Sequence, residues 1–232
     1  MLQGVSHKFR SGCMMLARSR GEAINFLGSA FLVHGQGYLL TAAHLTAREE
    51  DLVVVPTRSD EAFRPVVMAG VVAMDVEVRQ RDDERDVALL RIKQDIDIRV
   101  PDDFLGSTES VPPGVSVMSL GYSFGYQHIY SLLGFNATIG AKIRSQNDTS
   151  LILYDSAFHE GDRGGPLIDI ADGHIIGIVS GRFEPAEIAT HEGPSIERLE
   201  ARETNVTYAV AIEYGLDLMQ AEGLLPGQFG TS

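Results

Sequence analysis

Three short segments of the sequence carry residue types suited to hydrolytic chemistry. Residues 37–44 read Gly-Tyr-Leu-Leu-Thr-Ala-Ala-His, an apolar run that ends at His44. Residues 86–92 begin with Asp86 and continue as Val-Ala-Leu-Leu-Arg-Ile, and residues 161–166 read Gly-Asp-Arg-Gly-Gly-Pro, with Arg163 in third place. A histidine, an acid and a glycine-rich turn are parts from which a general base and an anion-binding nest can be built.

Each segment also has a plainer interpretation when it is taken alone. A histidine after a strand is commonly a surface or core residue, and an acid before an apolar strand is commonly a turn residue. Three glycines in six positions give residues 161–166 unusual backbone freedom, which suits either a tight turn or a nest of N–H groups. The function therefore has to be argued from the three segments together.

Taken together, the segments resemble the signatures of the trypsin-like serine peptidases of the bacterial type, which adopt the chymotrypsin fold. Those signatures read Thr-Ala-Ala-His, Asp-(Ile/Val)-Ala-Leu-Leu and Gly-Asp-Ser-Gly-Gly-Pro. The resemblance extends to residues 28–31 (Gly-Ser-Ala-Phe), 121–123 (Gly-Tyr-Ser) and 173–181, and it covers roughly residues 21–224. It implies a peptide-bond hydrolase in which a groove between two barrels receives a peptide or protein.

The resemblance implies roles for individual residues. His44 corresponds to the general base and Asp86 to the acid that fixes its tautomer. The backbone N–H groups of Gly161 and Arg163 correspond to the oxyanion hole. The pocket for a substrate side chain is expected to be formed by Ala157 at its base and by Ser180, Gly181 and Arg182 as its wall.

These pocket positions carry no carboxylate, so a trypsin-type preference for Lys or Arg is not expected. Arg182 and His159 instead suggest a preference for acidic or small residues at the cleavage position.

The main departure from the family pattern is Arg163, which stands where the family has its nucleophilic serine. A guanidinium is permanently protonated and has no nucleophilic oxygen, so the acyl-enzyme route is closed. The sequence also lacks the Ile/Val-Val-Gly-Gly start whose amino group pairs with the acid before the serine in some members. Asp162 therefore needs another partner, and Arg163 and Arg182 are the candidates.

Two functions remain open at this point. The chain is either a serine endopeptidase domain that is inactive with Arg163, or a non-catalytic pseudoprotease that binds peptides or proteins in the groove by strand addition. Metal-dependent hydrolysis is not expected, because the sequence has no His-x₃-His motif and no cysteine cluster. No cofactor is expected either.

The elements that must position these residues are mainly strands. Short β-prone runs separated by Gly, Asp-Gly and Pro-Gly predict an all-β fold, and the resemblance makes it two six-stranded antiparallel barrels. Ile212, Leu216 and Met219 recur at i, i+4 and i+7, which predicts a docked C-terminal helix. We expect an N-terminal segment over 1–20, a peptidase domain over 21–224 with the barrel boundary near 102–114, and a tail over 225–232.

Composition limits the partners and predicts a compartment. The net charge of −13 disfavours nucleic acid, and no apolar run approaches the roughly 20 residues of a membrane span. Basic residues interrupt residues 1–20, so a signal-peptide core is not evident, and Cys13 is the single cysteine; both observations lead us to expect a cytoplasmic protein. The Glu-rich residues 183–204 are expected to form a mobile loop that gates the groove or docks a partner.

Overall fold

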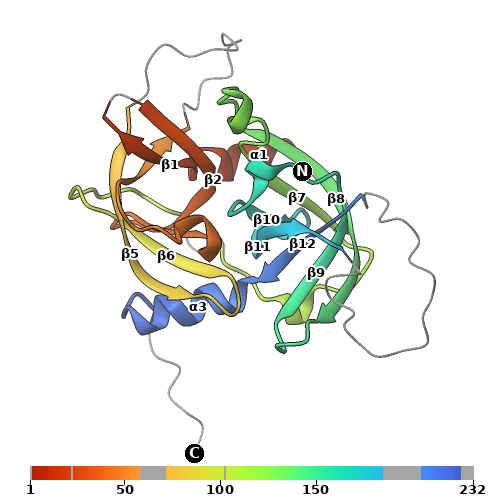
Figure 1. The fold of residues 1–232 in the computed structure, drawn as a ribbon. Coiled ribbons are helices and arrows are strands. Elements are labelled where there is room, and N and C mark those ends of the chain that lie inside the picture. The colour runs from red at the N-terminus through yellow and green to blue at the C-terminus, as the bar shows by residue number, and fades with distance from the viewer. Residues whose placement is uncertain (1, 22, 58–71, 102, 185–204, 226–232) are drawn as a thin grey trace, which may run out of the picture.

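The fold consists of two closed β-barrels that pack side by side (Figure 1). The computed structural model describes residues 2–21, 23–57, 72–101, 103–184 and 205–225. Each barrel contains six strands, and every neighbouring pair of these strands is antiparallel. The predicted fold class is confirmed: two six-stranded antiparallel barrels with a C-terminal helix.

The first barrel is closed by pairing between β1 and β4, and its strands follow the order β1-β2-β3-β6-β5-β4. Its strands are β1 (Cys13–Arg20), β2 (Ala23–His34), β3 (Tyr38–Thr41), β4 (Leu52–Pro56), β5 (Met74–Asp82) and β6 (Val87–Ile92).

The second barrel is closed by pairing between β10 and β7, and its order is β10-β11-β12-β9-β8-β7. Its strands are β7 (Ser116–Gly121), β8 (Leu133–Arg144), β9 (Ser150–Asp155), β10 (Pro166–Asp169), β11 (His174–Arg182) and β12 (Val206–Ala211).

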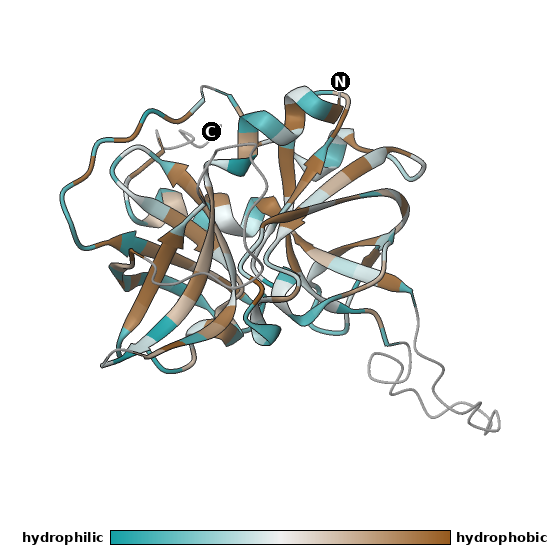
Figure 2. Ribbon diagram, turned by 90° about the horizontal axis from the view of Figure 1, so that it is seen from above, coloured by the Kyte–Doolittle hydropathy of each residue, from teal (hydrophilic) through white to brown (hydrophobic). Residues whose placement is uncertain are grey.

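Apolar side chains fill each barrel because alternate residues of a strand point to opposite faces. Leu16, Leu39 and Leu90 are fully buried in the first barrel, and Ile139 and Leu167 lie in the core of the second. Figure 2 shows that apolar residues are concentrated along the strands of both barrels. A further cluster of buried apolar residues draws on strands of both barrels, so the two barrels form one packed body.

Two α-helices complete the described part of the chain. α1 (Leu2–Arg10) buries Val5 and Phe9, and the Lys8 Nζ donates a hydrogen bond to the carbonyl of Gly173 at 3.0 Å. α3 (Ile212–Ala221) buries Ile212 and Met219 as the sequence periodicity predicts. No helix among the described residues has the length and apolar character needed to cross a membrane.

The structure departs from the sequence expectations at the N-terminus and in several strands. β1 is an integral strand of the first barrel, although the sequence pattern leaves residues 1–20 outside the domain. The helix α1 and the strands β8 and β10 are not indicated by the sequence pattern, because basic, polar or glycine residues interrupt them. One β-prone run of the sequence, residues 65–72, was expected to be a strand; it lies almost entirely outside the described residues, and β5 follows it.

Candidate functional site

Both barrels contribute to one site at the seam between them. His44 lies in the 3₁₀ turn η1 (Ala43–Thr46), directly after β3, and Asp86 lies in the turn between β5 and β6. Arg163 follows the 3₁₀ turn η4 (Glu160–Asp162), and Ser180 lies on β11. The first two residues belong to the first barrel and the last two to the second, so packing of the barrels assembles the site.

His44 and Asp86 are in direct contact, as expected from the sequence. The Nδ1 atom of His44 lies 2.9 Å from both carboxylate oxygens of Asp86. The backbone N–H of His44 also donates to Asp86 Oδ1, at 2.9 Å. Because the carboxylate accepts a hydrogen bond from Nδ1–H, it favours the tautomer in which Nε2 carries no proton and can accept one.

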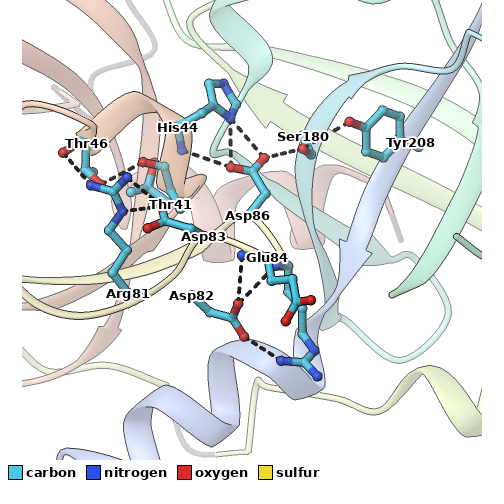
Figure 3. Close-up of polar contacts among 12 residues, drawn as sticks. Thr41, His44, Thr46, Arg81, Asp82, Asp83, Glu84, Asp86, Ser180 and Tyr208 are labelled. Atoms are coloured by element: carbon cyan, nitrogen blue, oxygen red, sulfur yellow. Dashed lines mark hydrogen bonds and ion pairs between the residues drawn. The ribbon is translucent and has the colours of Figure 1, made fainter. Parts of the chain in front are cut away.

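A strained turn aims the carboxylate of Asp86 at the histidine (Figure 3). Asp86 has a φ of 58°, in the left-handed region that aspartate tolerates better than most residues. The turn is held by Asp82, whose Oδ1 accepts hydrogen bonds from the backbone N–H groups of Glu84 at 3.1 Å and Arg85 at 3.0 Å. Asp82 thereby holds the turn from which Asp86 reaches His44.

Ser180 and Tyr208 extend the contact into the second barrel. The hydroxyl of Ser180 donates a hydrogen bond to Asp86 Oδ2 and lies 3.4 Å from the hydroxyl of Tyr208 (Figure 3). Burial disfavours the ionised form of Asp86, but hydrogen bonds from His44 and Ser180 outweigh it and hold the pKa of this carboxyl below its usual value. Asp86 is therefore an ionised acceptor of three donors at neutral pH.

The sequence predicts Ser180 only as part of the pocket wall. It predicts neither the hydrogen bond of Ser180 to Asp86 nor any part for Tyr208 in the site. A polar residue at the end of the apolar run 175–179 was the available signal for Ser180. Tyr208 carried no comparable signal, because tyrosine is common in strands.

Arg163 shares a pocket with His44 and Asp86. The pocket has a volume of about 450 Å³ and is lined by His44, Asp86, Phe158, Glu160, Arg163, Ser180, Gly181, Arg182, Glu184 and Tyr208. The guanidinium of Arg163 is ion-paired through Nη1 to Glu160 Oε2 and lies 5.0 Å from the ring centre of Phe158. The position where the family has a hydroxyl therefore presents a cation to the pocket.

The two residues whose N–H groups are expected to form an oxyanion hole lie at the end of a 3₁₀ turn. Gly161 lies within η4, and Arg163 follows it directly with φ of −54° and ψ of 134°. In the residues described, Gly164 has the positive φ of this segment, +80°, and its N–H donates to the carbonyl of Val179 at 2.7 Å.

Asp162 has partners other than the two arginines that the sequence suggested. Its Oδ1 accepts a hydrogen bond from Ser123 Oγ at 2.6 Å, and its Oδ2 accepts one from the backbone N–H of His159 at 3.3 Å. Burial raises the pKa of Asp162 above its usual value, against the effect of these hydrogen bonds. The expectation for Arg163 was wrong because the carboxyl of Asp162 is buried in the second barrel, whereas Arg163 turns to Glu160.

Three of the four residues expected to form a substrate pocket line this cavity, and the fourth does not. Ser180, Gly181 and Arg182 line the pocket, whereas Ala157 is exposed and its neighbour Phe158 is the lining residue. The chain turns after the end of β9, and this turn directs Phe158 inward and Ala157 outward.

His159 does not line this pocket, and its ring stacks on Phe135 with the ring centres 5.3 Å apart. Within the described ranges, no group of three or more His, Cys, Asp or Glu side chains is placed to hold a metal ion.

Comparison with known families agrees with this fold and site. The model of the trypsin-like peptidase domain matches residues 28–178, which is more than half of the chain. The chain therefore belongs to the trypsin-like peptidase domain family.

Among curated proteins and solved structures, the chain is similar to serine proteases of the HtrA and DegP type. Probable periplasmic serine endoproteases named DegP-like are 29% identical over 157 residues in Pseudomonas fulva (68% of this chain, 29% of the relative) and 27% identical over 193 residues in Pseudomonas fluorescens (83% and 34%). This chain spans about a third of their length.

Two solved structures share the fold at lower identity. The HtrA-type protease AlgW with tripeptide has a TM-score of 0.69 and 22% identity, and the match covers 95% of this chain and 63% of that one. The MamO protease domain from Magnetospirillum magneticum, in its apo form, has a TM-score of 0.65 and 16% identity, with coverage of 91% and 97%.

The expected cytoplasmic location is contradicted by these relatives, whose names place them in the periplasm. The expectation was wrong because it rested on one cysteine and on the basic residues of 1–20. A single cysteine does not exclude export, since a domain with a large apolar core needs no disulfide. The basic residues belong instead to α1 and β1, which are parts of the folded domain.

Proposed function

We propose that this domain binds extended peptides in the groove between its barrels and does not cleave them through an acyl-enzyme. One observation carries the proposal: a contacting His44–Asp86 pair shares its pocket with Arg163, which supplies a cation where a hydroxyl would be needed. The other candidate function, a serine endopeptidase, shares the same fold and differs at that residue.

The His–Asp pair retains part of the chemistry of acyl transfer. In this proposal Asp86 orients His44, and Nε2 of His44 is able to accept a proton. No hydroxyl at position 163 can deliver that proton and attack a carbonyl. In a comparable protease, loss of the serine lowers kcat by about 2 × 10⁶, roughly as much as loss of the whole triad.

The groove retains the backbone needed to hold an extended peptide. The pairing of β10 with β11 begins at Pro166 and Ile178, so the end of β11 beyond Val179 lacks β10 as a neighbour. On its other side, this end of β11 pairs with Thr207 and Tyr208 of β12. Because Ser180 and Gly181 border the pocket beyond the last pair with β10, a peptide strand can add there through main-chain hydrogen bonds.

The relatives support this assignment of ligand class and suggest where the domain works. The HtrA-type protease AlgW, which shares the fold, has been solved with a tripeptide and with a decapeptide, and the curated relatives are named as periplasmic. We extend both features to this chain as part of the proposal: a peptide ligand and a periplasmic location.

The proposal is tested by measuring binding and cleavage on the same samples. Fluorescein-labelled extended peptides are titrated with the full chain and followed by anisotropy, and mass spectrometry of each mixture reports any cut. Binding without cleavage is expected. Cleavage that scales with the concentration of the Arg163 chain and disappears in His44→Ala would establish the endopeptidase instead.

Two glycine variants locate the bound peptide. A Cβ at Gly181 would lie 3.1 Å from the Tyr208 ring and would crowd the pocket wall, so Gly181→Ala is expected to weaken binding. Gly140→Ala is the matched control, since its Cβ would approach no atom more closely than 3.8 Å on a strand of the same barrel. Equal binding by the two variants would place the peptide elsewhere.

A further inference from the structure

We infer that Arg163 makes the groove selective for peptides that end in it, by binding their C-terminal carboxylate. The inference rests on the proposed function, that the groove holds peptides, and it names the part of the peptide that the altered site recognises. An ordinary peptidase groove receives an internal peptide bond at this place, whereas this chain presents a guanidinium.

The backbone of Arg163 is fixed on both sides. Its carbonyl accepts a hydrogen bond from the N–H of Ser29 at 2.8 Å, which ties it to the first barrel. The next residue, Gly164, donates to the carbonyl of Val179 at 2.7 Å, which ties it to the second. The guanidinium therefore extends into the pocket from a rigid base, with Phe158 beneath it at 5.0 Å.

The guanidinium has free capacity for a carboxylate. Guanidinium groups carry five N–H donors in a planar fork that matches the two oxygens of a carboxylate. Within the described residues, the polar contacts of this group involve Nη1 alone, to Glu160. The side chain is 28% exposed, so it is reachable from the groove but partly shielded from water.

Glu160 competes with a ligand for this cation, but weakly. Its side chain is 61% exposed, and exposed ion pairs contribute little because water screens them. A carboxylate that enters the pocket can bind both arms of the fork, which is the stronger arrangement. A peptide carboxylate can therefore displace Glu160 from the guanidinium of Arg163.

The other acidic residues of the pocket do not prevent a peptide carboxylate from binding Arg163. Both oxygens of Asp86 already accept hydrogen bonds, from His44 and Ser180, so they are occupied. Glu184 is exposed at the rim, and Arg182 adds a second cation to the lining. A peptide that continues past Arg163 must also make room for its bulky side chain, whereas a peptide that ends there avoids this cost.

The test compares peptides that differ only at their C-terminus. A pool of N-terminally fluorescein-labelled hexapeptides is made once as free acids and once as amides, and each is titrated with the full chain by anisotropy. The acid pool is expected to bind at least tenfold more tightly. Arg163→Gln keeps a polar side chain without the charge and is expected to remove the difference.

Two further variants complete the design. Glu160→Gln, which leaves Arg163 untouched, is expected to tighten binding of the acid pool and to leave the amide pool unchanged. Arg144→Gln is the control, because Arg144 is likewise paired with a nearby acid, Asp148 at 2.9 Å, but lies outside the pocket. It is expected to retain the full preference for acids.

The outcomes separate this inference from the proposed function. Equal binding of acids and amides by the unaltered chain overturns the carboxylate site and leaves peptide binding in the groove intact. Binding of neither pool overturns both. A preference for acids that survives in Arg163→Gln assigns the carboxylate to another cation and also overturns the inference.

Discussion

Replacing Gly164 with alanine is expected to destabilise the domain by about 2 to 5 kcal/mol. The φ of +80° alone costs an L-residue roughly 1 to 2 kcal/mol. An added Cβ would also lie 2.1 Å from the carbonyl oxygen of Ser29 and 2.2 Å from Thr41 Oγ1. Overpacking of this kind costs about 1 to 3 kcal/mol. Because Ser29 and Thr41 belong to the first barrel, the methyl group would force the barrels apart at the site.

The assay is thermal and urea unfolding followed by circular dichroism. For a domain of this size the loss corresponds to a Tm lower by about 4 to 20 °C. Gly114→Ala is the matched control, since Gly114 has a φ of +93° but no atom within 4 Å of its Cβ position. It is expected to cost only about 1 to 2 kcal/mol. Equal losses in the two variants would refute the argument that close contact between the barrels requires glycine at 164.

Three further predictions concern titratable groups. The lowered pKa of Asp86 stabilises the fold at pH values above its unfolded pKa of about 4, and this contribution is lost as the pH falls through the folded pKa. Asp86→Asn should therefore reduce the dependence of the unfolding free energy on pH between about pH 5 and pH 2.5, measured by urea unfolding. An unchanged pH dependence would contradict this. Ser180→Ala should raise the pKa of Asp86 in an NMR titration and cost about 1 to 2 kcal/mol, whereas an unmoved pKa would remove Ser180 from the network. Burial raises the pKa of Cys13 to about 12, so Ellman's reagent at pH 8 should label it only after unfolding, and rapid labelling of the folded chain would show that the thiol is accessible.

The all-β class and the C-terminal helix were predictable from local patterns, whereas the two barrels and the His44–Asp86 pair were predictable from the resemblance to a known family. The runs that end at His44 and begin at Asp86 are apolar strands, β3 and β6, which pair with each other in the first barrel. A helix at the C-terminus followed from the spacing of Ile212, Leu216 and Met219. Such patterns lie within a few residues of one another, so one sequence is enough to read them.

The features that were missed depend on distant parts of the chain. β1 is stabilised by pairing with β2 and β4, and its own sequence ends in Arg-Ser-Arg, which does not read as a strand. The partners of Asp162 are set by the burial of its side chain against Ser123, 39 positions away. Similarly, the glycine-rich hexapeptide begins in the 3₁₀ turn η4, and its Arg163 and Gly164 are held by backbone hydrogen bonds to Ser29 and Val179, which lie far away in the sequence.

The central claim is that Arg163 prevents acyl transfer at a site whose His–Asp pair is assembled. The most direct measurement is the intact mass of the chain after incubation with a fluorophosphonate at pH 8. No adduct is expected on the unaltered chain, while Arg163→Ser should gain one adduct that is lost when His44→Ala is added. A stoichiometric adduct on the unaltered chain that depends on His44 would contradict the claim, because another hydroxyl would then be the nucleophile.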